Sequence, residues 1–148
     1  TEKMVVKTYR GLLADGGQDR IRLQTIKGKV GYRIVKFDLF PNKPGQESVE
    51  NNVLIWKSEQ SSVSVTAVDV DFTDSDLLAV GMFHDSSSES TTAGVTVVFD
   101  SEIFNQDIYI THTDTNSNIP CNYYIELEVI PLDDAGAEYT TLKDMRQT

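Results

Sequence analysis

Apolar and polar residues alternate along much of this chain, and the alternation is clearest in its C-terminal half. Segments 94–100, 107–113 and 122–132 each place apolar side chains at every second position over most of their length. A period of two is typical of strands that bury one face and leave the other face in water. The pattern therefore predicts antiparallel β-strands in this part of the chain, separated by polar loops.

The N-terminal half carries the same signal in shorter pieces. Further strands are predicted at residues 4–9, 20–26, 32–40, 53–59 and 63–68. Residues 77–84, LLAVGMFH, fit a buried strand and also fit a helix, because a short apolar run does not separate the two. Most of the chain is thus expected to be extended.

Turn-forming residues separate the predicted strands. They include Asp-Gly-Gly within a turn at 12–17, a Pro- and Gly-rich stretch at 41–45 and a serine-rich stretch at 85–92. Near the C-terminus, Tyr139, Leu142 and Met145 stand three residues apart, which predicts one short amphipathic helical turn.

About eight short strands at regular spacing are typical of a β-sandwich. We therefore expect an all-β fold, a single antiparallel, jelly-roll-like sandwich domain over residues 1–148, with a short C-terminal helical turn at most. The length suffices for a substantial core, since a domain of this size buries roughly 70% of its unfolded surface. The single cysteine, Cys121, rules out a disulfide within the chain.

Charge is unevenly distributed along the sequence. The chain has a net charge of −10, yet the first 43 residues hold ten Lys and Arg residues against four acidic ones. Such a chain can set its basic part against its own acidic part or against the acidic part of another copy. The overall sign argues against nucleic-acid binding, because affinity for phosphate grows with the number of basic contacts.

Two acidic loops are candidates for a calcium site. The first is the loop that contains Asp69, Asp71, Asp74 and Asp76. The second, 114–118, opens like a calcium loop but has Ile119 where glycine is expected and Ile125 where a bidentate glutamate is expected. Aspartates in loops also cap turns with their own side chains, which is the commoner use. We predict no metal and no cofactor, with the first loop as the leading calcium candidate.

The sequence offers little for catalysis. It has no G-x-S-x-G motif, and Cys121 has no neighbouring histidine in sequence. His84 and His112 could contribute to a zinc site, but a structural site needs four ligands. Glu126 and Glu128 share one strand face, whereas catalytic carboxylate pairs face each other across a cleft. We therefore predict that the protein is not an enzyme and assign no catalytic residues.

Aromatic residues leave a binding role open. Some aromatic residues could form a platform for a sugar or an interface with another protein. The candidates are Tyr32, Phe37, Phe40, Trp56, Tyr109, Tyr123 and Tyr124. Tyr123 and Tyr124 are adjacent, so their side chains must point to opposite faces of their strand. One of the two is expected to be exposed or at an interface, and the sequence does not decide which.

Four segments together resemble the small virion structural proteins of marine tailed bacteriophages, including those that infect cyanobacteria. They are GKVGYRIVKFDLFPNKPG (28–45), VVFDSEIFNQDIYITHTD (97–114), NYYIELEVIPL (122–132) and TLKDMRQT (141–148). The similarity runs from about residue 20 to the C-terminus, and FDSEIFNQDIYITH is its most specific part.

The resemblance implies a non-enzymatic, β-rich particle component. We expect a capsid decoration or cement protein that binds the major capsid protein, located in the virion after synthesis in the host cytoplasm. The alternatives are a tail or head–tail ring component, or a carbohydrate- or calcium-binding β-module. A homo-oligomer is expected, a trimer or a dimer, with other virion proteins as partners and neither nucleic acid nor membrane. The termini, 1–10 and 142–148, are the segments expected to reach a neighbour.

Overall fold

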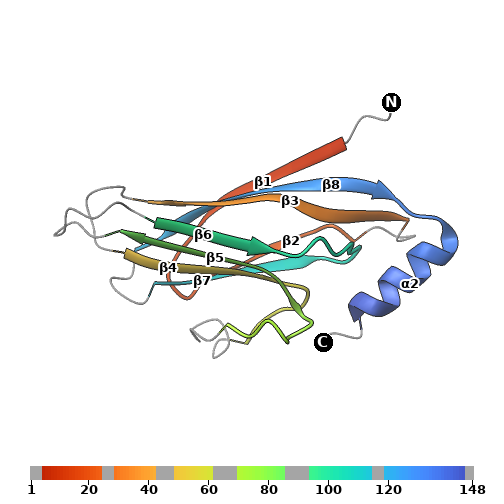
Figure 1. Ribbon diagram of the computed structural model, residues 1–148. Coiled ribbons are helices and arrows are strands. Elements are labelled where there is room, and N and C mark those ends of the chain that lie inside the picture. Colours follow the sequence, from red (N-terminus) through yellow and green to blue (C-terminus); the bar gives the residue numbers. More distant parts are fainter. Residues whose placement is uncertain are drawn as a thin grey trace.

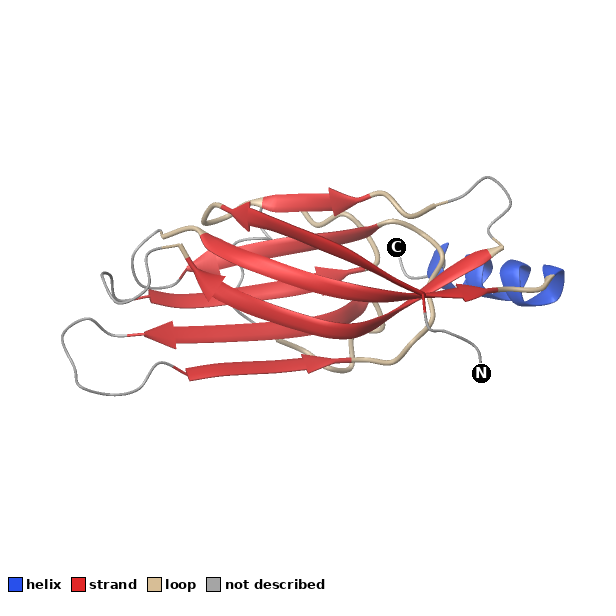
Figure 2. Ribbon diagram, turned by 90° about the horizontal axis from the view of Figure 1, so that it is seen from above, coloured by secondary structure: helices blue, strands red, loops and turns tan. Residues whose placement is uncertain are grey.

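In a computed structural model, the described residues of the chain form two antiparallel β-sheets packed as a sandwich, with a helix at one end (Figures 1 and 2). The structure describes residues 5–24, 29–42, 49–61, 70–85, 94–114 and 119–145. The predicted all-β sandwich is confirmed. The strand predicted at 63–68 lies outside the described residues.

The two sheets differ in width. The narrower sheet has the order β1-β8-β3, formed by Val5–Leu13, Cys121–Pro131 and Val30–Pro41. The wider sheet has the order β2-β7-β4-β5-β6, formed by Gln18–Ile21, Ile108–Asp114, Val49–Trp56, Leu77–Asp85 and Gly94–Phe99. Eight strands match the prediction, whereas this division into three and five does not by itself establish a jelly roll.

A tight turn carries the chain from the narrow sheet to the wide one. β1 continues to Leu13, inside the predicted turn, and the turn itself is Ala14–Gly17. Gly16 adopts a φ of 76°, a conformation that glycine reaches without the strain of a β-carbon. Its N–H donates to the carbonyl of His112 (2.8 Å), and the N–H of His112 donates to the carbonyl of Gly17 (3.1 Å). The turn is therefore bonded to β7.

The core lies between the sheets and follows the alternation seen in the sequence. Ile125 and Leu127 on β8 face Ile108 and Ile110 on β7, and all four are fully buried. A non-strand segment completes the core. Within it, Phe104 is buried and exchanges two backbone hydrogen bonds with Tyr32, of 2.7 and 2.9 Å.

The C-terminal helix α2 spans Asp134–Met145 and lies against one end of the sandwich (Figure 1). It is longer than the single turn predicted. Its apolar residues Tyr139, Leu142 and Met145 point to solvent, whereas Thr140 and Asp144 are buried. The docked face of the helix is therefore mainly polar, with Ala137 as its buried apolar residue, and the three-residue spacing of large apolar side chains marks the outer face. No helix in the described ranges is long and apolar enough to cross a membrane.

Ion pairs between buried groups join α2 to the sandwich. The ammonium of Lys57 lies 2.6 Å from Glu102 Oε1 and 3.8 Å from Asp144 Oδ1. The side chains of Lys57 and Asp144 are only 3% and 1% exposed. Burial raises the pKa of Asp144. Burial also acts to raise the pKa of Glu102, but hydrogen bonds from Lys57 and Lys143 outweigh it and hold that pKa below its usual range.

Candidate functional site

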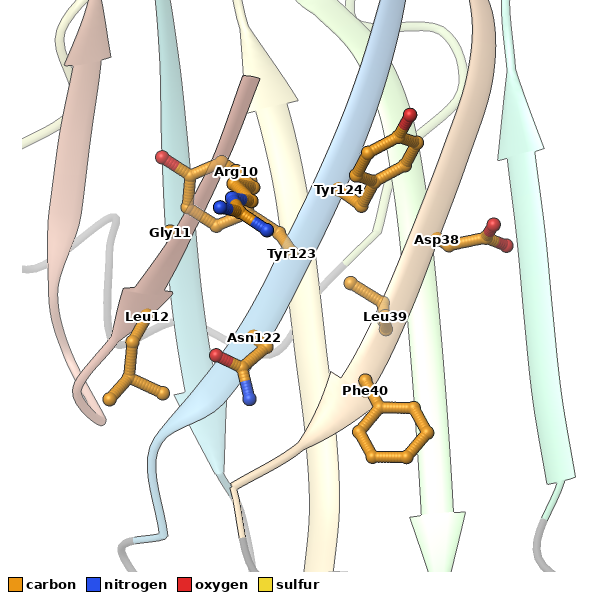
Figure 3. Close-up of a pocket in the computed structure, with 9 residues that line it drawn as sticks. All are labelled: Arg10, Gly11, Leu12, Asp38, Leu39, Phe40, Asn122, Tyr123 and Tyr124. Atoms are coloured by element: carbon orange, nitrogen blue, oxygen red, sulfur yellow. The ribbon is translucent and has the colours of Figure 1, made fainter. Parts of the chain in front are cut away.

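A pocket of about 860 Å³ opens on the outer face of the narrow sheet, and Figure 3 shows its lining. We call it the outer groove. Its outward-facing side chains are Arg10, Leu12, Asp38, Phe40, Asn122 and Tyr124. All three strands of the sheet contribute, because each strand presents alternate residues on this face.

Strand register sorts these side chains into two rows across the sheet. Tyr124 on β8 stands between Arg10 and Asp38, its direct neighbours on β1 and β3. Asn122 stands in the same way between Leu12 and Phe40. Directly opposite side chains on one sheet face lie close enough to interact. The groove thus combines a row with opposite charges at its ends and a row with apolar ends.

Tyr124 is held in place by polar neighbours. Its hydroxyl donates to Glu126 Oε2 at 2.9 Å, and this hydrogen bond raises the pKa of Tyr124. The ammonium of Lys36 lies 5.7 Å from the centre of the ring, within the range of a cation–π contact. Lys36 also pairs with Asp38 at 3.6 Å. The ring is therefore oriented while its surface remains partly open.

Tyr123 occupies the opposite face of β8. It is buried, its hydroxyl donates to Asp19 Oδ2 at 2.9 Å, and burial raises its pKa. Gly11 on β1 lies opposite, where a β-carbon would stand 2.8 Å from the Tyr123 hydroxyl oxygen. The structure thereby settles the orientation left open by the sequence: Tyr123 is the buried member of the pair, and Tyr124 is on the outer groove.

The groove is suited to binding. Phe40 is 60% exposed and Leu12 is also exposed, so the apolar row is open to a partner. Among the described residues that line the pocket, Asp38 is the only carboxylic acid, and none is His, Cys or Ser. Arginine, tyrosine and exposed phenylalanine are side chains that often carry binding energy at interfaces.

Sequence analysis found only part of this site. Phe40 and Tyr124 were among the aromatic candidates, whereas Arg10, Leu12, Asp38 and Asn122 were not singled out. The predicted strand ends at residue 9 and the predicted turn begins at residue 12, whereas β1 extends through Arg10 and Leu12 and places them on the same face. Alternation does not show that this strand pairs with β8, so the grouping was not accessible.

The aspartates of the predicted calcium loop have separate partners. Asp71 accepts hydrogen bonds from the Thr73 N–H (2.9 Å) and hydroxyl (2.6 Å), and Asp74 accepts one from the Asp76 N–H (2.9 Å). Asp76 is buried and accepts from Ser58 and Gln60. Asp69 lies outside the described residues. In the described ranges no group of three or more His, Cys, Asp or Glu residues could hold a metal ion.

The other polar candidates also lie apart from the groove or have structural partners. His84 is exposed at the end of β5, whereas His112 is buried on β7. Cys121 is buried, and burial raises its pKa to about 12, which keeps the thiol protonated. Glu126 binds Tyr124, and Glu128 pairs with Arg33 on the same outer face.

Both ring nitrogens of His112 have polar partners, one in the turn after β1 and one on β4. Nδ1 lies 3.1 Å from the Ala14 carbonyl oxygen, and Nε2 lies 2.8 Å from Asn51 Oδ1. A neutral ring has one N–H and donates it to Ala14. Turning the Asn51 amide by 180° lets its Nδ2, otherwise without a partner, donate to Nε2. The neutral ring is then satisfied on both sides.

Acidification from pH 7 to pH 5 is expected to destabilise the fold through His112. Burial lowers the pKa of His112 below 6.5, so the unfolded chain takes up a proton that the folded chain resists. Neutral His112 therefore leaves the free energy of unfolding unreduced above pH 6.5. Below that pH, the free energy of unfolding falls by at most about 1.4 kcal/mol per pH unit. Urea unfolding at pH 7, 6 and 5 measures it.

His112→Gln should reduce this dependence on pH, whereas His84→Gln, at an exposed position, should preserve it. The pKa values of Asp76 and Asp144 are raised by burial and act in the opposite direction. The comparison of each variant with the native chain cancels their effect. Equal slopes in the native chain and in His112→Gln would contradict the assignment.

Comparison with known proteins does not add a family to this picture. No protein-family model matches the chain, and a search of the curated proteins gives no match.

Proposed function

We propose that the protein is a non-enzymatic structural component of a bacteriophage virion, a capsid decoration protein that binds the major capsid protein. The outer groove is the observation that carries the binding role, because it exposes Phe40 and Leu12 beside an ordered row of polar groups. The virion setting rests on the resemblance of the four sequence segments described above.

The chemistry of the groove favours a protein segment as its ligand. Phe40 and Leu12 offer apolar surface to bury, while Arg10 and Asp38 offer opposite charges on either side of Tyr124. Apolar contacts surrounded by polar groups are the usual composition of a protein interface. Charges of both signs fix the register of a bound segment more than they raise its affinity.

A carbohydrate-binding module is the second candidate. Tyr124 presents an aromatic ring next to Arg10, Asp38 and Asn122, which can hydrogen-bond to sugar hydroxyls. Aromatic surface with a few polar groups around it is the usual composition of a small-ligand site. A tail or head–tail ring role would use the same groove on a different virion protein.

Truncation of Phe40 tests the proposed function. Phe40→Ala and, separately, Tyr124→Ala are expected to weaken binding to shells of the major capsid protein about tenfold or more, as for buried aromatic contacts at interfaces. Phe72→Ala is the matched control, because Phe72 is at least as exposed and lies away from the groove. Co-sedimentation with purified shells measures the affinity.

Three outcomes would contradict capsid binding through this groove. The native chain would fail to bind the shells, or Phe40→Ala would bind as well as Phe72→Ala, or only a glycan array would respond. A glycan response that Tyr124→Ala abolishes would establish the carbohydrate-binding alternative.

A further inference from the structure

One strand at the margin of the wide sheet lacks the protection that the other sheet edges have. Two open sheets have four edge strands, here β1, β3, β2 and β6. β1 carries Lys7 and Arg10, β3 carries charges and a register shift between Ile34 and Lys36, and β2 is only four residues long. Charge, bulges and short length all discourage pairing with another chain. β6 reads GVTVVF and has none of these features.

Both faces of β6 are apolar as well. Val95 and Phe99 point to the side of the core, opposite the buried Phe83 and Ala79 of β5, and yet they are exposed. Val98 on the other face is 50% exposed. Such composition is usual for a strand that is covered on both faces, which β6 is not. In the described part of the chain, β6 pairs with β5 alone.

The free backbone groups of β6 can be identified from one hydrogen bond. Beyond the end of the strand, the N–H of Asp100 donates to the carbonyl of Leu78 at 3.0 Å, in register with the β5–β6 ladder. In antiparallel pairs the bonded positions alternate. The N–H and C=O groups of Val95, Val97 and Phe99 therefore point away from β5, toward the open edge.

We propose that β6 pairs antiparallel with β6 of a second copy of this chain, about a two-fold axis that passes next to Val97. The wide sheets of the two copies then form one continuous sheet. The proposal goes beyond the outer groove, because β6 belongs to the other sheet.

Symmetry and side-chain direction together fix the register. A two-fold axis perpendicular to the sheet keeps each face on its own side, so a residue can only oppose one from the same face. With Val97 opposite Val97, Val95 lies opposite Phe99 and Thr96 lies opposite Val98. All three outward-pointing residues then form bonded pairs, with about six backbone hydrogen bonds in total. A β-branched residue opposite an aromatic one is a favourable cross-strand pair.

The β6 edge carries no charged side chain that would oppose a second copy. Two chains of net charge −10 repel each other, and β6 offers them a contact without charged side chains. At each end of the pairing, an imidazole of one copy comes near a carboxylate of the other, and its ring N–H can donate a hydrogen bond to that carboxylate. His84 lies opposite Gly94 on β5, and in the proposed register Asp100 of the second copy lies opposite Gly94 on the other side. The backbones at His84 and at Asp100 of the second copy are then two strand spacings apart, about 9.6 Å. Gly94 lies between them without a side chain, so the His84 and Asp100 side chains can meet across it.

The native mass of the purified chain is the first test. Sedimentation equilibrium should give twice the chain mass of 16.5 kDa. Val98→Lys, which opposes Thr96 and leaves the core side untouched, should raise the dimer dissociation constant at least tenfold. Val5→Lys is the matched control, since Val5 is 57% exposed on an edge of the other sheet, and it should leave the dimer intact. A monomeric native chain, or a dimer or trimer indifferent to Val98→Lys, would overturn the proposal.

A disulfide test reads the register directly. Thr96 and Val98 form a non-bonded pair, where the α-carbons of opposite residues lie about 4.5 Å apart, within reach of a disulfide. The double variant Thr96→Cys with Val98→Cys should give a covalent dimer under mild oxidation, and Thr96→Cys alone should not. Cys121 is buried and stays out of the reaction. Failure of the double variant to cross-link would exclude this register.

The dimer and the proposed function can fail separately. A dimeric chain that binds no capsid shell would contradict the decoration role and keep the β6 interface. A monomeric chain whose binding to shells is lost in Val98→Lys would show that a strand of the capsid protein, and not a second copy, occupies the edge.

Discussion

Replacement of Lys57 by methionine is expected to destabilise the protein by about 3–5 kcal/mol, the usual cost of removing one partner of a buried ion pair. The Lys57 ammonium pairs with Glu102, which Lys143 also contacts at 3.1 Å, and it lies near Asp144, in a region where both Lys57 and Asp144 are almost fully buried. Without it, Asp144 Oδ1, which accepts no hydrogen bond, loses its only cation within 4 Å among the described residues. Helix α2 should loosen together with the end of the sandwich.

Chemical denaturation of Lys57→Met measures this loss. Lys36→Met is the control, because Lys36 pairs with Asp38 on the surface, where an ion pair contributes about 0–1 kcal/mol. Adding Asp144→Asn to Lys57→Met should restore part of the stability, since it removes the unpaired carboxylate. A similar small cost for both lysine variants would mean that the buried amine is not needed to balance the acids.

Phe104→Ala is expected to cost about 3–5 kcal/mol as well, through the cavity that a buried phenylalanine leaves. Phe104 is one of the largest fully buried side chains and comes from a segment outside the regular strands. Its ring stacks near that of Tyr32, with centroids 6.4 Å apart, and its backbone is bonded to Tyr32 on β3. Loss of the ring should therefore weaken the attachment of this segment to the narrow sheet.

Thermal unfolding gives the corresponding readout, at about 2–4 °C per kcal/mol for a chain of this size. Phe72→Ala serves as the matched control, because Phe72 is exposed and should shift the melting temperature by little. A melting temperature of Phe104→Ala within about 2 °C of the control would correspond to a change in stability below roughly 1 kcal/mol. The segment would then not be an integral part of the core.

Local alternation predicted the strands well where one face is buried and the other faces water. The predicted segment 122–132 corresponds to β8 at Cys121–Pro131, and 94–100 corresponds to β6 at Gly94–Phe99. Residues 77–84 proved to be a strand, β5, rather than a helix. For β8 the signal lies within the segment itself, because the period of two reflects burial on one face. β6 alternates as well although most of its side chains are exposed, and the apolar run of β5 had left strand and helix open.

Features that depend on pairing between distant segments were not accessible from the sequence. The outer groove requires β1, β8 and β3 to be neighbours, and residues of β1 and β8 in register are more than a hundred positions apart along the chain. The face on which α2 docks was also not predicted. Asp144 lies on that face and is buried through contacts with Lys57 and Asn105, which are distant in sequence. Apolar spacing alone would have placed Leu142 inward.

The partnership between the first strand and the last has a consequence for biosynthesis. Val5 pairs with Val129, so β1 has no neighbour in its sheet until the residues of β8 have been made. At about 5–20 residues per second, the ribosome takes roughly 6–25 seconds to add the residues between them. Strand-by-strand folding during translation is thus impossible for the narrow sheet. The nascent chain must keep its basic N-terminal segment soluble and unpaired for that time, and the narrow sheet closes only after β8 has been synthesised.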